Sequence, residues 1–248
     1  MIPKKNLILA CQISGVYDVN RNETLQHDDF SLVKEWADSL KKLDLQGVLF
    51  HNGFSENTIA KYQNAHLKFE KVHYDSYFNP NVFRYLAYKN YLEQQKENIC
   101  GVFLTDVSDV VAIKNPFIQP FFINNSQAIF CGDEPKPLMN DWMTEHSAHF
   151  RKSIPGFDSY EENFKNASLL NCGIIGGKTK IILEFLGHVC EIHQKYNQNQ
   201  TSAFTGDMGA FNYVIRTRFN SRVIHGFPVN TVFKAYQVER KDCWFRHK

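Results

Sequence analysis

The stretch VFLTDVSDVVAIKNPF, residues Val102–Phe117, decides how this sequence is interpreted. An apolar run over Cys100–Thr105 leads directly into Asp106 and Asp109, and a second apolar run ends at Asn115 and a proline. A continuous apolar run of this length is typical of a buried strand in a parallel sheet. Ligands of such sheets bind just beyond the carboxyl ends of the strands. We therefore predict a strand over Cys100–Thr105 with a ligand site at its carboxyl end.

Outward from this stretch, apolar runs of strand length alternate with longer stretches of helical period. The alternation is typical of α/β proteins with a mostly parallel central sheet flanked by helices. Because no Pro/Gly/Ser-rich linker and no repeat divides the chain, we predict one domain over residues 1–248. In the first half we predict strands at Asn6–Ile13, Gly47–His51 and Leu67–Tyr74, and helices at Asp29–Leu43, Thr58–Gln63 and from Asn79 to Gln95.

The second half of the sequence is less regular. A polar and aromatic stretch, Asp133–Asn166, has weak periodicity, and a segment so long is either functional or carries short helices of its own. Around it we predict strands at Gln127–Cys131, Leu169–Ile175 and Arg222–Ile224, and helices at Lys178–Tyr196 and Asp207–Arg218.

The charge and the cysteine content indicate which classes of protein the sequence does not favour. Lys and Arg number 28 and Asp and Glu number 26, a net charge of +2 that does not favour nucleic-acid binding. The six cysteines include no CxxC pair and no Cys–His cluster at zinc-ligand spacing, so we expect reduced thiols and a cytoplasmic protein. The C-terminal VERKDCWFRHK mixes cations with Trp244 and Phe245, which is typical of a solvated terminus or of peripheral contact with an anionic membrane.

The two carboxylates after the predicted strand Cys100–Thr105 suggest a metal site. Asp106 and Asp109 would repel each other at the end of a strand unless a cation lay between them. Mn²⁺ or Mg²⁺, bound by one or two carboxylates together with diphosphate oxygens, relieves this repulsion. The alternative is that one aspartate caps a turn and the other is merely exposed.

Four motifs along the chain favour the metal site. VFLTDVSDVV resembles the acidic DxD-type motif of GT-A nucleotide-sugar glycosyltransferases, in a D-x-x-D spacing, and NPNVFRYLAYKNYL resembles the helix that precedes it. LLNCGIIGG is similar to the N-x-G-x-x-G-G segment of that family. GDMGAFNYVI is similar to its D-Q-x-x-(F/L)-N helix start, with Met208 in place of the glutamine. The resemblance covers nearly the whole chain and implies a Rossmann-like GT-A domain.

The family resemblance also implies roles for individual residues. Asp106 and Asp109 would bind the metal and the nucleotide-sugar donor, and Arg84 would pair with phosphate or with a carboxylate of the acidic motif. Asp207 would be catalytic, by stabilising positive charge on the donor sugar, or would only cap its helix. The remaining expectations are His225 as a third metal ligand, Asn171, Gly173, Gly176 and Gly177 beside the donor sugar, and Tyr17 against the base.

The acceptor side is expected in the irregular stretch. Trp142, Asp141 and Glu145 combine an aromatic face with carboxylates, a combination that suits stacking on a sugar ring and hydrogen bonding to its hydroxyls. These residues therefore predict a glycan or glycolipid acceptor.

Other functions share parts of this pattern. A sugar-phosphate nucleotidylyltransferase would carry a Gly- and Arg-rich loop after the first strand, where QISGVYDVNRN has a single glycine. A haloacid-dehalogenase-like phosphatase would place its nucleophilic aspartate after the first strand, and Asp106 comes too late for that. A catalytically silent carbohydrate- or nucleotide-binding domain stays open.

Overall fold

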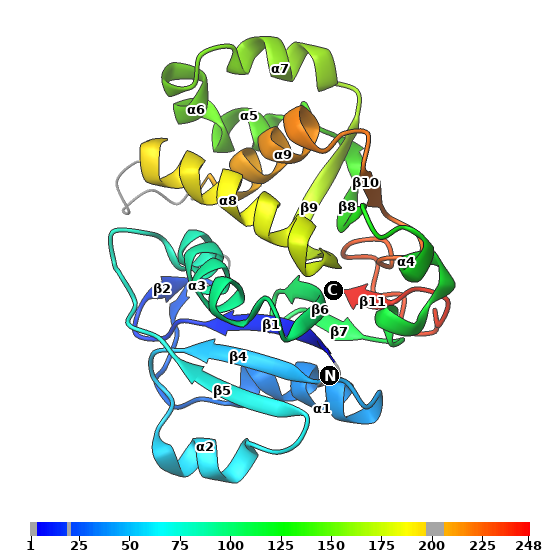
Figure 1. The fold of residues 1–248 in the computed structure, drawn as a ribbon. Helices are drawn as coiled ribbons and strands as arrows, with labels where there is room; N and C mark the ends of the chain where they lie inside the picture. Colours follow the sequence, from blue (N-terminus) through cyan, green and yellow to red (C-terminus); the bar gives the residue numbers. More distant parts are fainter. Residues whose placement is uncertain (1–3, 19–20, 197–205) are drawn as a thin grey trace.

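A seven-stranded sheet forms the centre of the molecule, in the order β10-β8-β9-β6-β1-β4-β5 (Figure 1). The structure is a computed structural model that describes residues 4–18, 21–196 and 206–248. β9 runs antiparallel to both of its neighbours, and the other neighbouring strands are parallel. The strands of this sheet are β1 (Lys5–Gln12), β4 (Gly47–His51), β5 (Leu67–Lys71), β6 (Ile99–Thr105), β8 (Ile129–Pro137), β9 (Ser168–Lys178) and β10 (Val223–His225).

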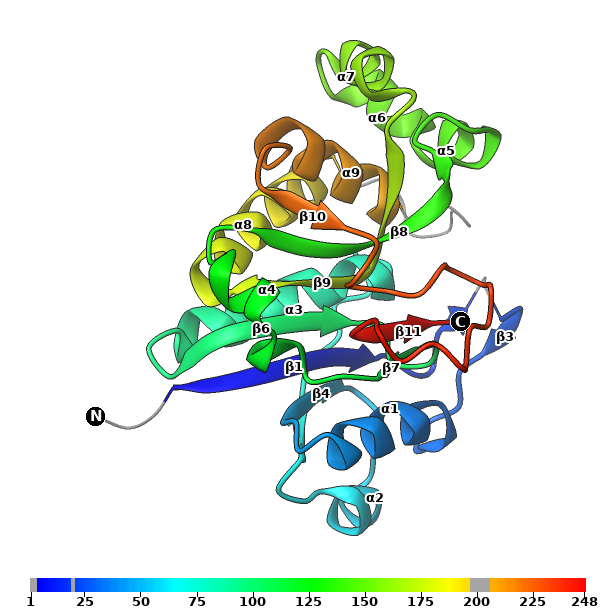
Figure 2. The same ribbon diagram turned by 90° about the vertical axis from the view of Figure 1, so that its right-hand side faces the viewer.

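Two hydrophobic layers cover the two faces of the sheet. On one face, side chains of α3 (Pro80–Gln95), α8 (Thr179–Tyr196) and α9 (Asp207–Arg218) pack against the strands, and α3 and α8 lie side by side (Figure 1). On the other face lie α1 (Ser31–Lys42), the short helices η1 (Pro116–Ile118) and α4 (Pro120–Asn124), and the strand pair β7 (Val110–Ala112) and β11 (Phe245–His247) (Figure 2). An α/β architecture with a mostly parallel central sheet flanked by helices is therefore confirmed.

The predicted elements before Gln127 and after Asn166 are all present, with ends that shift by at most three residues. The long irregular stretch carries the second half of β8 and three short helices, which lie together beyond one edge of the sheet (Figure 2). The helix α2 (Glu56–Tyr62) matches the predicted short helix. Several short elements have no counterpart among our predictions: α5 (Asp141–His146), α6 (Ala148–Ser153), α7 (Phe157–Phe164), η1, α4, β2 (Tyr17–Asp18), β3 (Glu23–Thr24), β7 (Val110–Ala112) and β11 (Phe245–His247).

The C-terminal segment differs most from its prediction. β11 pairs antiparallel with β7, and the Trp244 and Phe245 side chains are buried against Phe103 in the core. The expectation that these aromatic residues belong to a solvated terminus is therefore wrong, and peripheral contact of the C-terminal segment with a membrane stays a prediction. Burial of two large aromatic rings is more favourable than their exposure, and the edge of β7 supplies the hydrogen bonds that the segment needs.

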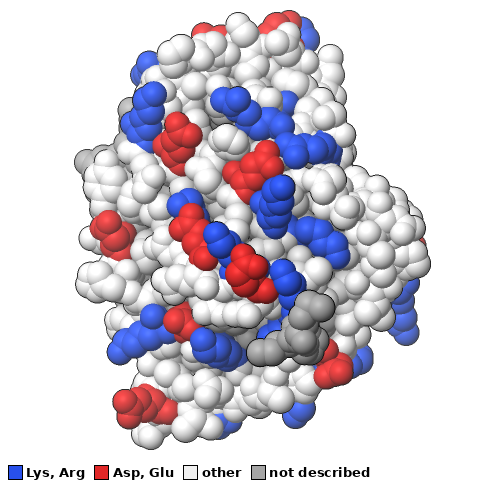
Figure 3. Space-filling view, in the orientation of Figure 1, with Lys and Arg blue, Asp and Glu red and all other residues white. Residues whose placement is uncertain are grey.

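Surface charge, the state of the cysteines and the hydrophobicity of the helices bear on the class of protein. Lys and Arg alternate with Asp and Glu across the face shown in Figure 3, and no broad region of one sign gathers there. All six cysteines are free, four of them buried. None of the helices in the described ranges is long and apolar enough to cross a lipid bilayer.

Candidate metal and donor site

Asp106 and Asp109 lie at the carboxyl end of β6, in the turn that leads into β7. The turn is fixed at its start because Asp106 N donates to Gly173 O at 2.9 Å. It is fixed at its end because Lys248 N donates to Asp109 O at 2.9 Å. Strands β9 and β11 therefore hold the two aspartates in place, on the edge of the sheet where the sequence predicts a ligand site.

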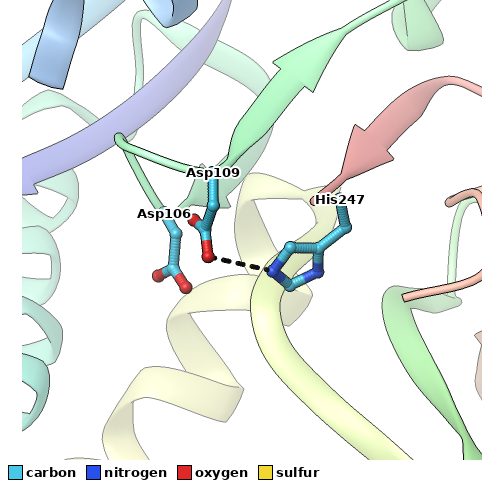
Figure 4. A group of neighbouring side chains, drawn as sticks. All are labelled: Asp106, Asp109 and His247. Atoms are coloured by element: carbon cyan, nitrogen blue, oxygen red, sulfur yellow. Dashed lines mark ion pairs between the residues drawn. The ribbon is translucent and has the colours of Figure 1, made fainter. Parts of the chain in front are cut away.

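A third ligand candidate, which the sequence did not indicate, comes from the C-terminal strand. In the β7–β11 pair His247 lies opposite Val110, the residue next to Asp109. Its Nε2 lies 3.6 Å from Asp109 Oδ2, and one ligand atom from each of Asp106, Asp109 and His247 falls within 4.8 Å of the others (Figure 4). His247 is buried, and its backbone N donates to Thr231 Oγ1 at 3.2 Å, so its position is fixed.

The glycine at position 173 gives this cluster its space. A Cβ atom there would lie 2.5 Å from His247 Cε1, 2.8 Å from Asp106 Oδ2 and 3.0 Å from Asn171 Oδ1. Asn171 is held in turn, since its Oδ1 accepts from Gly173 N at 2.7 Å and its Nδ2 donates to Glu134 Oε1 at 2.9 Å. Asn171 and Gly173 therefore line the cluster, and their predicted place beside the donor sugar stays a prediction.

A buried chain of polar contacts joins the metal cluster to Asp207. Arg84, on α3, donates through Nη1 to Asp106 Oδ1, and its Nη2 lies 3.7 Å from Asp207 Oδ2. Asp207 stands in the first turn of α9, and its Oδ1 lies 3.2 Å from Nε2 of His146. The predicted pairing of Arg84 with a carboxylate of the acidic motif is thus confirmed.

Burial, the neighbouring carboxylate and two basic side chains set the electrostatics of the cluster. Burial raises the pKa of Asp106, and repulsion from Asp109 adds to the rise, while the Arg84 guanidinium opposes both. Burial also works to raise the pKa of Asp109, but the His247 imidazole and Arg84 outweigh it and lower that pKa overall. Asp109 Oδ1 and His247 Nδ1 are buried with no hydrogen-bond partner among the described residues. Polar atoms left in this state commonly face a bound ion or a water molecule.

Cys172 also lies in this network and is not a nucleophile. Its Sγ lies 3.6 Å from Asp207 Oδ2 and accepts from Arg84 Nη2 at 3.4 Å. Burial and the Asp207 carboxylate raise the pKa of the thiol well above its ordinary value, so it stays protonated and neutral.

His225 is not part of the metal cluster, contrary to our prediction. It ends β10, and its Nδ1 donates to Asp133 Oδ2 at 2.9 Å. Gly176 and Gly177 lie apart from the metal cluster as well, and their predicted place beside the donor sugar stays a prediction. Because β9 runs antiparallel to β6, they pair with Phe103 and Val102, away from the carboxyl end of β6. Cβ atoms at these two positions would lie 2.1 Å from the Phe103 ring and 2.9 Å from Ala128 O, so close core packing explains both glycines.

Of the proposed acceptor residues, only Trp142 connects to the site. Its ring stacks on His146, with centroids 4.3 Å apart and planes at 22°, and His146 contacts Asp207. Asp141 and Glu145 are exposed on α5. Tyr17 is exposed in the β2–β3 hairpin, where its hydroxyl donates to Asn22 Oδ1. The roles of Tyr17, Asp141 and Glu145 stay predictions.

Comparison of the sequence with models of protein families gives no match, and comparison with curated proteins gives no significant match. The function of this protein is therefore inferred from the geometry of the site together with the sequence motifs.

Proposed function

We propose that this protein is a metal-dependent glycosyltransferase that moves a sugar from a nucleotide-sugar donor to a hydroxyl group of a glycan or glycolipid acceptor. The observation that carries the proposal is the convergence of Asp106, Asp109 and His247 beside Gly173, at the carboxyl end of β6. This edge of a parallel α/β sheet is where nucleotides bind in related architectures. The GT-A assignment itself depends on the sequence motifs.

The residues of the cluster fit a divalent cation. Two carboxylates and one imidazole offer two oxygens and one nitrogen, a mixed set that suits Mn²⁺ better than Mg²⁺, which prefers oxygen ligands. Asp106, Asp109 and His247 would hold the ion. When bound, it would neutralise the diphosphate of the donor and stabilise the departing nucleotide.

Other residues of the site would act on the donor directly. Gly173 has no side chain, so it leaves room for a ligand to approach the β9 backbone next to Asp106. Arg84 would hold Asp106 in position and would also balance the negative charge of the site. Asp207 would lie beside the donor sugar and stabilise positive charge that develops on the anomeric carbon. Its contacts with Arg84 and His146 would keep the carboxylate oriented for that role.

The proposal is tested with UDP-glucose, UDP-galactose, UDP-N-acetylglucosamine and GDP-mannose, each with Mn²⁺ or with EDTA. We expect at least one donor to raise the midpoint of thermal unfolding only when Mn²⁺ is present, and to be turned over slowly with water as acceptor. A carbohydrate- or nucleotide-binding domain would show the stabilisation without turnover. A nucleotidylyltransferase would instead release sugar phosphate in the presence of pyrophosphate. Turnover that is unaffected by EDTA would contradict metal dependence.

A further inference from the structure

A second polar pair lies at the same edge of the sheet, on β8 and β10, with β9 between these strands and β6. His225 Nδ1 donates to Asp133 Oδ2 at 2.9 Å, and both side chains are about one quarter exposed. Because Nδ1 carries the proton of this hydrogen bond, Nε2 is the ring nitrogen that can accept one. A histidine oriented by a carboxylate is the arrangement that general bases use.

Contacts of the turn that follows β10 hold this histidine–aspartate pair in position. Gly226 has φ +70°, and a Cβ atom at that position would lie 2.6 Å from Asp133 Oδ2. Gly226 O accepts hydrogen bonds from Val229 N at 2.6 Å and from Asn230 N at 3.2 Å, which closes the turn. Asn230 Nδ2 then donates to Asp133 O at 3.3 Å. The turn after β10 thus fixes the aspartate and the histidine together.

Asp133 also lines a groove. The groove has a volume of about 470 Å³, and its walls include Glu134, Pro135, Pro137 and Val232. Carboxylates together with proline and valine surfaces suit a sugar ring, which offers hydroxyls at its edge and C–H groups on its faces. Glu134 is buried and is tied to the metal cluster through Asn171, which also accepts from Gly173 N. The groove and the candidate donor site therefore share a wall.

The distance between the metal cluster and the His225–Asp133 pair leaves room for a donor sugar and an acceptor hydroxyl. Asp133 pairs with Leu170 on β9, and Gly173, which touches Asp106 and His247, lies three residues further along that strand. At about 3.3 Å per residue the spacing is roughly 10 Å along the strand. That length accommodates a donor sugar next to the cation and an acceptor hydroxyl next to His225.

We propose that the groove binds the acceptor sugar and that His225, oriented by Asp133, is the general base for its hydroxyl; this rests on the proposed function. The acceptor O–H proton goes to His225 Nε2 while the acceptor oxygen forms a bond to the anomeric carbon of the donor. The bond from that carbon to the diphosphate breaks, and its electron pair leaves with the nucleoside diphosphate. Asp133 stabilises the imidazolium. Such a single displacement inverts the anomeric carbon.

The test uses the donor found above and p-nitrophenyl glycosides of glucose, galactose and xylose as acceptors. We expect His225→Gln to lower kcat for transfer by about 10²–10⁴-fold, the usual contribution of a general base. Asp133→Asn should lower it in the same direction. Stabilisation by Mn²⁺ with the nucleoside diphosphate of that donor should be unchanged in both variants. The matched control is His66→Gln, since His66 Nδ1 lies 3.6 Å from Asp44 at the opposite end of the sheet, and its transfer rate should be normal.

Two measurements on the unmodified protein keep the test decisive if a variant fails to fold. NMR of the sugar product should show an inverted anomeric centre, and ¹⁵N NMR of His225 should show the Nδ1–H tautomer. A retained centre, the opposite tautomer, or a His225→Gln rate within threefold of the unmodified protein would each overturn this proposal alone. Absence of both turnover and Mn²⁺-dependent stabilisation with all four donors would overturn the proposed function as well.

Discussion

Gly173→Ala adds only one methyl group, yet we expect it to disturb the metal cluster severely. The added Cβ would lie 2.5 Å from His247 Cε1 and 2.8 Å from Asp106 Oδ2, where normal contacts between carbon atoms are about 3.5–4.0 Å. Relief of both contacts needs a shift of roughly 1 Å. His247 is buried in β11 and Asp106 is bound to Arg84, so neither side chain can move without disturbing the cluster.

The expected loss follows from that shift. A displacement of about 1 Å at a reacting centre can cost about 10²-fold in rate, and overpacking of a buried site costs about 1–3 kcal/mol of stability. We therefore expect kcat for Mn²⁺-dependent turnover to fall about 10²-fold and Mn²⁺ to bind more weakly. Turnover with the best donor and calorimetric titration with MnCl₂ measure the two effects, and urea unfolding measures the stability.

The matched control is Gly187→Ala, in the middle of α8. A Cβ atom there would meet nothing within 4 Å among the described residues. Alanine in a helix is favoured over glycine by about 0.5–1 kcal/mol, so this variant should be slightly more stable and fully active. If Gly173→Ala kept the activity and the Mn²⁺ affinity of the control, the close packing of the cluster around residue 173 would be wrong.

Three further outcomes are expected. His146→Gln should lower kcat about 10-fold and leave donor affinity nearly unchanged, because His146 lies 3.2 Å from Asp207 and orients a charge that acts in the transition state; an equal fall in affinity would contradict this. Burial lowers the pKa of His193 to about 4, so below pH 6.5 the unfolded chain takes up a proton that the folded chain refuses. Stability should therefore decrease by about 3 kcal/mol from pH 7 to pH 4, and His193→Phe should remove that part of the decrease in urea unfolding. Trp244→Ala should cost about 3–5 kcal/mol in the same assay, because the ring is buried, whereas an exposed tail residue would cost almost nothing.

The sequence predicts the strand and the helices that position the site residues, because these elements have clear local periodicity. The apolar run that ends in Asp106 forms β6, and the helix with Arg84 packs where its guanidinium reaches that carboxylate. Asp207 also lies in the predicted region, although its contact with His146 depends on a stretch whose short helices have weak periodicity.

The third candidate metal ligand, His247, could not be predicted from local sequence patterns. His247 reaches Asp109 only because a three-residue strand at the end of the chain pairs with β7, and such pairing between distant short segments leaves no periodic signal. The one available hint is the aromatic pair Trp244 and Phe245 directly before it, which had to be buried somewhere. The sequence favours His225 instead because it follows a recognisable strand, and no sequence pattern indicates that His225 Nδ1 is hydrogen-bonded to Asp133.

The central claim is that Asp106, Asp109 and His247 bind one divalent cation. It is tested most directly by calorimetric titration of MnCl₂ into the protein without nucleotide, and into Asp109→Asn and His247→Gln, with thermal unfolding as the control for folding. We expect one Mn²⁺ per chain, and binding at least 10-fold weaker in each variant, since removal of even an outer partner of a metal ligand commonly costs about 10–100-fold. Absence of Mn²⁺ binding, or equal affinity in all three proteins, would contradict the account.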